Sequence, residues 1–195
     1  MTEFQISPLR ADDEAAIAQT AAFMPDAFRS MAPEFVPDEA AALDEIRGML
    51  DPADNINLIA VDSSGVLGWI GGIPTYDGNV YELHPLAVRP GRQRSGVGTA
   101  LVRALEMAVA ARGGLTLYVG SDDVMGTTSL AGIDVYPNPL DHLAHLRDLG
   151  GHPYRFYERC GFVLVGLVPD ANGFGKPDIF LAKRVGQPAP AKQPN

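Results

Sequence analysis

The sequence has little cysteine, little histidine and no excess of positive charge. Its 195 residues include one cysteine and four histidines, which excludes an intrachain disulfide and a cysteine-based metal cluster. A lone thiol is typical of proteins in a reducing compartment. Because Cys160 directly precedes Gly161, we interpret it as a small packing residue rather than a nucleophile.

The charge balance is acidic, with 24 Asp and Glu against 15 Lys and Arg and a formal net charge of −9. Proteins that bind nucleic acid need a basic face, so the composition argues against a nucleic-acid partner and is compatible with a polycationic substrate. No apolar run reaches the length of a membrane span, and residues 1–22 are acidic instead of having a basic start and an apolar core. We therefore predict a cytoplasmic protein without a membrane partner.

Length and patterning predict an α/β (α+β) protein. An apolar content of 46% over this length suits a single domain, which we place at residues 1–185, and the polar, proline-rich residues 186–195 are typical of a disordered tail. Alternating and helical periodicities predict the elements. The strands are expected at residues 4–6, 58–62, 66–75, 81–88, 115–121, 162–168 and 178–184, and the helices at 12–22, 38–50, 97–111, 140–149 and 154–159. The connection 122–151 is long, which favours a function or an interface.

A glycine turn between the strand at 81–88 and the next helix is the clearest motif. Gly96 and Gly98 lack the Cβ atoms that would keep an anion from the unpaired N–H groups of the first helical turn, so the turn predicts a phosphate or pyrophosphate site. Val97 and Gly98 stand where a P-loop needs Lys and Ser/Thr, and Leu101 replaces the third glycine of a dinucleotide fingerprint. These replacements argue against ATP, GTP and NAD. The alternative interpretation is that these glycines only allow the chain to turn at the start of the helix and bind no phosphate.

Two polar residues on the preceding strand are candidates for chemistry. Glu82 and His84 are two residues apart and project to the same face, whereas Leu83 projects to the other. Pro85 removes a ladder donor, which predicts a bulge or a local separation from a neighbouring strand. A solvated outer face is the alternative interpretation.

The combination Gln93-x-x-Gly96-x-Gly98 with Phe156-Tyr157-Glu158-Arg159-Cys160-Gly161-Phe162 resembles the GNAT superfamily of acetyl-coenzyme A-dependent N-acetyltransferases. More specifically, the sequence is similar to the aminoglycoside 6'-N-acetyltransferases. The matching segments lie at residues 82–86, 112–114, 121–123, 152–154, 171–173 and 176–179. The similarity runs from about residue 58 to 183. Phe23-Met24-Pro25 departs from the family's Trp-Pro pair, so we expect part of the acceptor pocket to differ from that of the family.

The resemblance implies a GNAT fold, in which a mixed central sheet has a splayed central strand pair and flanking helices. It also implies acetyl-coenzyme A as co-substrate, a homodimer and a role in antibiotic resistance. The expected coenzyme-binding residues are Leu86, Val88, Gln93, Arg94, Ser95, Gly96, Val97, Gly98, Thr99 and Tyr157. The expected acceptor-binding residues are Glu82, His84, Asp122, Asp123 and Asp178.

Four residues are expected to act in catalysis. Glu82 would accept the amine proton, His84 would orient the acceptor, and the Leu86 N–H would bind the thioester oxygen. Tyr157 would donate to the departing sulfur. No metal site is predicted, since Asp141, His142 and His145 fit a surface helix equally well.

Two other functions remain open. The chain could be a GNAT enzyme that acetylates a polyamine, a peptide amine or a small metabolite, or it could be a non-catalytic coenzyme A sensor.

Overall fold

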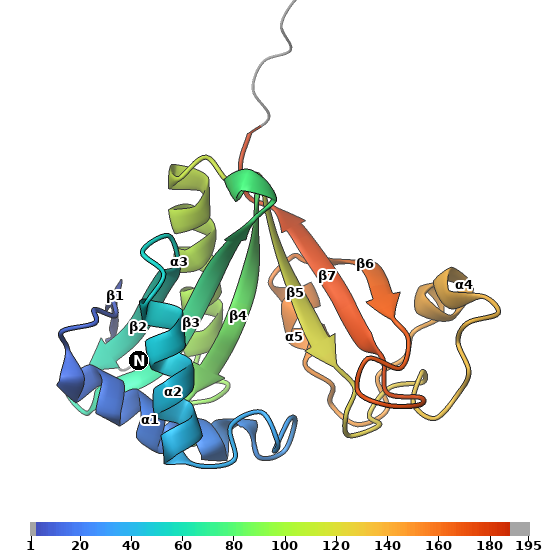
Figure 1. Cartoon of the computed structure of the whole chain (residues 1–195), viewed down its shortest axis with the longest axis horizontal. Helices are drawn as coiled ribbons and strands as arrows, with labels where there is room; N and C mark the ends of the chain where they lie inside the picture. Colours follow the sequence, from blue (N-terminus) through green and yellow to red (C-terminus); the bar gives the residue numbers. More distant parts are fainter. Residues whose placement is uncertain (1–2, 188–195) are drawn as a thin grey trace, which may run out of the picture.

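The computed structural model describes residues 3–187 of the chain. Within that range, seven strands form one mixed sheet in the order β1-β2-β3-β4-β5-β7-β6 (Figure 1). The strands are β1 (Gln5–Pro8), β2 (Ile56–Asp62), β3 (Gly65–Thr75), β4 (Val80–Val88), β5 (Thr116–Asp122), β6 (Val163–Val168) and β7 (Asp178–Arg184). The helices are α1 (Glu14–Phe28), α2 (Glu39–Leu50), α3 (Val97–Ala111), α4 (Pro139–Ala144) and α5 (Tyr154–Arg159), with a 3-10 turn, η1 (Tyr76–Gly78).

Helices cover both faces of the sheet. The apolar stripe of α3 packs with Tyr81 and Leu83 of β4, and the same cluster includes Tyr154 and Tyr157 of α5. Helices α1 and α2 pack on the opposite face against a second cluster that contains the fully buried Trp69. Burying an apolar stripe on each side stabilises the sheet from both faces.

The sheet opens in its middle. Strands β4 and β5 are parallel and pair only at Val80↔Thr116, Tyr81↔Leu117 and Glu82↔Tyr118. Beyond this last pair they diverge, so that β1–β4 and β5–β7 form two arms joined at one end (Figure 1). The predicted splayed central strand pair is therefore confirmed.

A bulge in β4 accompanies the opening. The β3–β4 register pairs Ile70 with Leu86 but Gly72 with Leu83, so His84 and Pro85 together oppose Gly71. The extra residue reverses the facing of the strand, because Leu83 lies in the α3 cluster whereas Ala87 lies in the α1 cluster. The bulge predicted from Pro85 is confirmed, and it places Glu82 and His84 on the face that carries α1 and α2.

Most element boundaries agree with the sequence prediction, but two helices differ. Helix α1 continues through Pro25 to Phe28, because Phe23, Met24 and Ala27 are buried and extend its packed face. The helix expected at 140–149 ends at Ala144 instead. Residues 147–149 pair with 127–129, where Ser129 N–H donates to the Arg147 carbonyl at 3.0 Å and Leu149 N–H donates to the Thr127 carbonyl at 2.8 Å. Long-range pairing here replaces the local helical preference.

One lysine joins the two arms behind the opening. Lys183 Nζ of β7 donates to Glu106 Oε1 of α3 at 2.7 Å and to the Cys160 carbonyl at the end of α5 at 2.8 Å. A cation at a helix C-terminus also interacts favourably with the helix dipole. The contact fixes α5 relative to α3. Of the predicted disordered tail 186–195, residues 188–195 lie outside the described part of the chain.

We predict that Gly71→Ala will destabilise the protein. A Cβ at position 71 would overlap the His84 carbonyl oxygen and the Met49 side chain, so the bulge would have to shift. Overpacking of this kind costs roughly 1–3 kcal/mol of unfolding free energy, which urea denaturation would measure.

Gly48→Ala on the exposed face of α2 is the matched control, since no atom lies within 4 Å of its added Cβ. This substitution should stabilise the helix by roughly 0.5–1 kcal/mol. Equal unfolding free energies for the Gly71→Ala variant and the wild type would contradict the tight packing at the bulge.

Candidate active site

Glu82 lies at the point where β4 and β5 separate. Its Oε2 atom accepts a hydrogen bond from the Tyr118 hydroxyl at 2.9 Å. Burial raises the pKa of Tyr118 to about 12, and the hydrogen bond to Glu82 acts in the same direction. The phenol therefore stays protonated at neutral pH and remains a donor to the carboxylate.

His84 is held between an acid and an aromatic ring on the same face. Its Nε2 atom lies 3.2 Å from Glu45 Oε1 of α2, and the two side chains are 37% and 26% exposed. The Phe35 ring meets the imidazole edge to face, with ring centroids 5.5 Å apart. The imidazole thus has a fixed plane while part of its surface stays accessible, as orientation of a substrate or a water molecule requires.

Asp178 and Asp122 face one another across β7 and β5 as a register pair. Burial, the nearby Asp122 and then Glu82 raise the pKa of Asp178 to about 7. Its Oδ1 atom is buried and has no hydrogen-bond partner among the described residues. A Cβ at Gly120 would lie 2.7 Å from Asp178 Oδ2, so this glycine leaves room for the carboxylate. Asp122 accepts a hydrogen bond from the Asn172 side chain. These carboxylates form an acidic surface next to Glu82.

Asp123 is placed differently from its neighbour Asp122. It is fully buried, and its carboxylate accepts four hydrogen bonds from the backbone N–H groups and hydroxyls of Thr127 and Thr128. All of its ligand-binding capacity is used to order the start of the 122–151 connection. We therefore leave Asp123 out of the acceptor site to which the sequence assigned it.

A buried histidine links this region to α5. His152 Nδ1 accepts from Tyr154 N–H at 3.2 Å, so Nε2 carries the proton and donates to the Asp122 carbonyl at 3.2 Å. Burial lowers the pKa of His152 against the opposing effect of Asp123, which keeps the ring neutral. The N-terminus of α5 and the end of β5 are thereby joined through one side chain.

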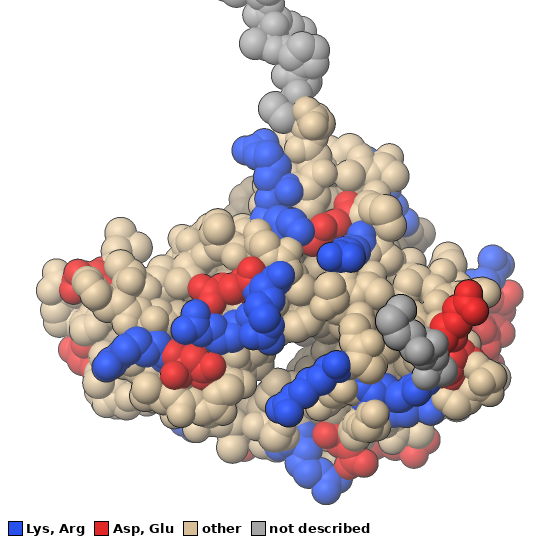
Figure 2. All heavy atoms as spheres, turned by 180° about the vertical axis from the view of Figure 1, so that it is seen from behind, with Lys and Arg blue, Asp and Glu red and all other residues tan. Residues whose placement is uncertain are grey.

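The glycine turn opens toward solvent on the other side of the sheet. Gly96 caps α3 with a left-handed φ of 92° and offers no side chain to the first-turn N–H groups. A Cβ at Gly98 would lie 3.3 Å from the Phe156 ring and 3.6 Å from Val88, so α3, α5 and β4 meet here. Lys and Arg side chains border a hollow near the centre of this face (Figure 2). Free N–H groups, a helix N-terminus and nearby cations suit phosphate groups.

Tyr157 lies on α5, one residue after the ring that contacts the glycine turn. Its side chain is buried between the Phe156 and Phe162 rings, with centroid distances of 5.2 and 5.8 Å. Burial raises its pKa well above the usual range. Within residues 3–187 its hydroxyl makes no hydrogen bond, so the proton is available to a bound group.

Comparisons with known proteins agree with this geometry. The model of the Acetyltransferase (GNAT) family matches residues 21–131. The chain belongs to the GNAT family. Members of this family use acetyl-coenzyme A as co-substrate.

Three solved structures are similar to this GNAT chain in sequence and fold to different extents. A crystal structure of an aminoglycoside 6'-N-acetyltransferase complexed with coenzyme A is 36% identical, with 95% of this chain and 99% of that chain covered and a TM-score of 0.83. The aminoglycoside 6'-N-acetyltransferase from Enterococcus faecium is 38% identical, with 95% and 99% covered and a TM-score of 0.84. The ribosomal-protein-S18-alanine N-acetyltransferase from Escherichia coli, 16% identical over 98% and 99% with a TM-score of 0.61, shares the fold alone. The search of curated proteins gave no match.

In this GNAT structure, the residues expected from the sequence fall into two groups. Glu82, His84, Asp122 and Asp178 lie on the face of α1 and α2, while the glycine turn and Tyr157 lie on the face of α3 and α5. Sequence reasoning missed Tyr118, Glu45, Phe35 and Asn172. Only Tyr118 had a local signal, because it alternates with the apolar Leu117 and Val119 on β5 and so shares a face with Gly120 and Asp122.

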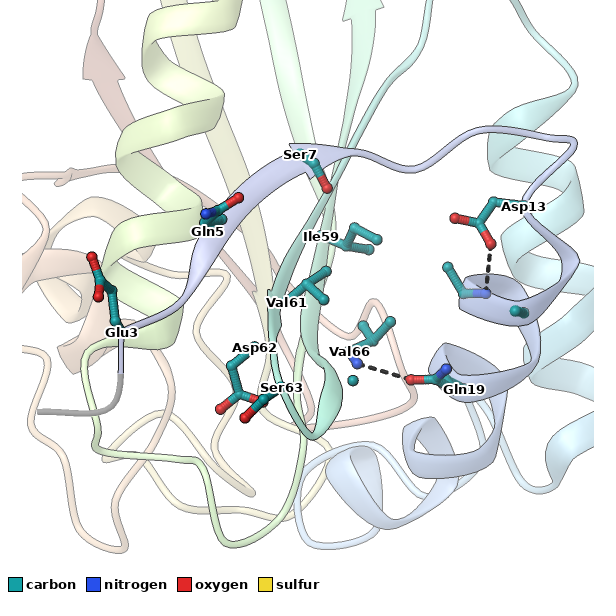
Figure 3. A pocket seen from close by; sticks show the side chains of 13 residues that line it. Glu3, Gln5, Ser7, Asp13, Gln19, Ile59, Val61, Asp62, Ser63 and Val66 are labelled. Carbon is teal, nitrogen blue, oxygen red and sulfur yellow. Dashed lines mark hydrogen bonds between the residues drawn. The ribbon is translucent and has the colours of Figure 1, made fainter.

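A pocket elsewhere in the GNAT chain is structural. It has a volume of about 610 Å³ and lies between β1, the β2–β3 turn and the start of α1 (Figure 3). Asp13 accepts from Ala16 N–H to cap α1, and Gln19 accepts from Val66 N–H at 2.9 Å. Asp62 pairs with Arg92. Asp13, Gln19 and Asp62 therefore already serve the fold, and none of the candidate catalytic residues lines this pocket.

In residues 3–187, no three His, Cys, Asp or Glu side chains are grouped so that they could hold a metal ion. No helix there combines the length and apolarity that a membrane span needs.

We predict that Asp178→Asn will flatten the dependence of stability on pH between about 4 and 7. Asp178 is protonated up to about pH 7 in the folded chain but only to about pH 4 when unfolded, so the folded state binds more protons in this window. The contribution of Asp178 to the free energy of unfolding is therefore fully present below pH 4 and is lost as pH rises through 7. Melting temperatures from pH 4 to 8 would show the wild type falling more steeply than the variant.

The control for this experiment is Asp12→Asn, since the Asp12 side chain is 77% exposed and pairs only with Arg10 in the described chain. It should keep the wild-type slope. Because Asp178 is partly exposed, we expect a difference of only a few degrees between the Asp178→Asn and wild-type melting curves. Parallel curves for these two proteins would show that Asp178 ionises normally.

Proposed function

We propose that the protein is an aminoglycoside 6'-N-acetyltransferase that transfers an acetyl group from acetyl-coenzyme A directly to a 6'-amine. The observation that carries this proposal is the 36–38% identity to two such enzymes over 95% of the chain. The acidic surface beside the opening of the sheet supports a polycationic acceptor, since Asp122 and Asp178 can pair with ammonium groups.

The coenzyme would bind on the face of α3 and α5. The proposed contacts for its pyrophosphate are the residues of the turn and of the first turn of α3, namely Gln93, Arg94, Ser95, Gly96, Val97, Gly98 and Thr99. Beyond Glu82, β4 has no partner on the side of β5, so Leu86 and Val88 lie along the opening where the pantetheine arm would run. Bound there, acetyl-coenzyme A supplies the activated acetyl group.

Four residues would act on the reacting atoms. Glu82 accepts a proton from the acceptor ammonium, directly or through water, so that the nitrogen lone pair can attack the thioester carbon. His84 orients the acceptor. The Leu86 N–H donates to the oxygen on which negative charge develops, a contribution of about 3 kcal/mol. As the carbon–sulfur bond breaks, the buried Tyr157 hydroxyl donates its proton to the sulfur, and the proton that the nitrogen loses as the amide forms replaces it on the phenol.

The alternative function is a GNAT enzyme for a polyamine, a peptide amine or a small metabolite, and a coenzyme A sensor is the non-enzymatic alternative. One thiol-release assay with acetyl-coenzyme A would compare 6'-amino aminoglycosides, their 6'-hydroxyl analogues, polyamines and peptides. We predict turnover of the 6'-amino drugs and poor turnover of the 6'-hydroxyl analogues, because a hydroxyl is the weaker nucleophile. Steady acetylation of peptides without turnover of any 6'-amino drug would reject the proposal.

We predict that Gly98→Asp will weaken acetyl-coenzyme A binding by roughly tenfold or more. The new carboxylate would stand at the N-terminus of α3 and repel the pyrophosphate, and its Cβ would press on the Phe156 ring. Titration calorimetry would measure the dissociation constant. Gly48→Asp adds the same charge to the exposed face of α2 and should leave it unchanged. Unaltered coenzyme affinity in a folded Gly98→Asp variant would remove the assignment of the phosphate site.

Four further attributes belong to the same proposal. We propose a single domain at residues 1–185, a homodimer, a cytoplasmic location and a role in antibiotic resistance. Light scattering would test the dimer, and the growth of cells on a 6'-amino drug with and without the protein would test resistance.

A further inference from the structure

Tyr118 is the one residue whose side chain donates a hydrogen bond to Glu82 within the described chain. The Tyr118 hydroxyl lies 2.9 Å from Glu82 Oε2. The two residues also form the last register pair of β4 and β5 before the strands diverge. The hydrogen bond therefore spans the sheet at the edge of the opening, where the acceptor amine would approach.

The Tyr118 side chain is itself held in place. Its backbone is paired on both sides, with Glu82 on β4 and with Ala182 on β7. Its ring packs near Phe180, with centroids 6.3 Å apart. A phenol on a central strand has few accessible rotamers, so its hydroxyl presents a donor in one direction.

Fixing one carboxylate oxygen has a chemical consequence for the other. A free glutamate side chain on a strand samples several rotamers, only some of which place an oxygen within reach of an incoming ammonium proton. With Oε2 occupied by Tyr118, Oε1 makes no hydrogen bond to the residues described and can receive that proton.

Tyr118 is a hydrogen-bond donor to Glu82 in surroundings that are mostly acidic. The charged or titratable groups near the Glu82–Tyr118 pair are Asp178 of β7, Asp122 of β5, Tyr76 of η1 and His84 of β4 with its partner Glu45. Most of these groups are acids, which cannot donate a hydrogen bond to Glu82 when ionised, whereas the Tyr118 hydroxyl can. A hydrogen bond donated to a carboxylate favours its ionised form, the form that can accept a proton.

We propose that Tyr118 is a positioning residue that holds Oε2 of Glu82 and thereby directs Oε1 at the acceptor amine. The proposal rests on the proposed role of Glu82 as proton acceptor. Tyr118 itself would not touch the reacting atoms.

The test is Tyr118→Phe, which removes the hydroxyl and keeps the ring. We expect kcat to fall by roughly tenfold while KM for acetyl-coenzyme A stays within about twofold of wild type. An unchanged kcat would overturn the proposal.

Tyr154→Phe is the matched control. The Tyr154 hydroxyl is buried and bonds no side chain of the described chain, so its removal leaves the Tyr118–Glu82 hydrogen bond intact. This variant should keep the wild-type kcat and KM. An equal loss of kcat in both variants would attribute the effect to general repacking and overturn the proposal.

A double-mutant cycle with Glu82→Gln separates positioning from a structural effect. If Tyr118 acts through Glu82, Tyr118→Phe should lower kcat by less than about twofold in the Glu82→Gln background, because the proton acceptor is already absent. A loss as large as that in the wild-type background would mean that Tyr118 acts independently of Glu82. Melting temperatures of the four proteins would show whether the two side chains interact at all.

The cycle can be measured with whichever amine the wild type acetylates. Turnover of a polyamine but of no 6'-amino drug would reject the proposed substrate, while the coupling between Tyr118 and Glu82 would still be decided on the polyamine. A wild-type protein that acetylates no amine would overturn both proposals.

Discussion

The separation of β4 from β5 is the constraint on which the rest of the structure depends. The two strands pair over three residues and then diverge, although each keeps a partner on its other side. A bulge at His84 and Pro85 accompanies this separation, with two residues of β4 opposite one residue of β3. Gly71 permits the bulge, since a Cβ at this position would collide with the His84 carbonyl.

The same bulge divides the chemistry between two faces. Before it, even-numbered residues of β4 point to the face of α1 and α2, where the acids lie. After it, Ala87 takes that face, and Leu86 and Val88 pack against the α3 cluster. An acidic surface and a phosphate-compatible helix end therefore flank one opening without facing each other directly. This arrangement would let the proposed cationic acceptor and the anionic coenzyme approach from opposite sides.

Partly and fully buried polar contacts hold the elements around the opening in place. Lys183 joins β7, α3 and α5, while His152 joins the end of β5 to the start of α5. Because such groups are costly to bury unless their hydrogen bonds are satisfied, each contact favours one arrangement over its alternatives. Asp123 belongs to this framework, and its neighbour Asp122 stays exposed on the acidic surface.

Local signals in the sequence determined a large part of this protein. Glycine at the start of α3, cation and glycine at its end, and the alternation of β7 each depend on residues close in the chain, so these elements begin and end where expected. The pairing of residues 147–149 with 127–129, which ends α4, joins segments that are far apart and has no local signal. The burial of Asp123 and the hydrogen bond between Tyr118 and Glu82 likewise follow from strand order and register. Sequence thus determined the family, the glycine turn and the strand that carries Glu82. Tertiary packing decided which acids face solvent and which side chain holds Glu82, because these properties depend on neighbours distant in the chain.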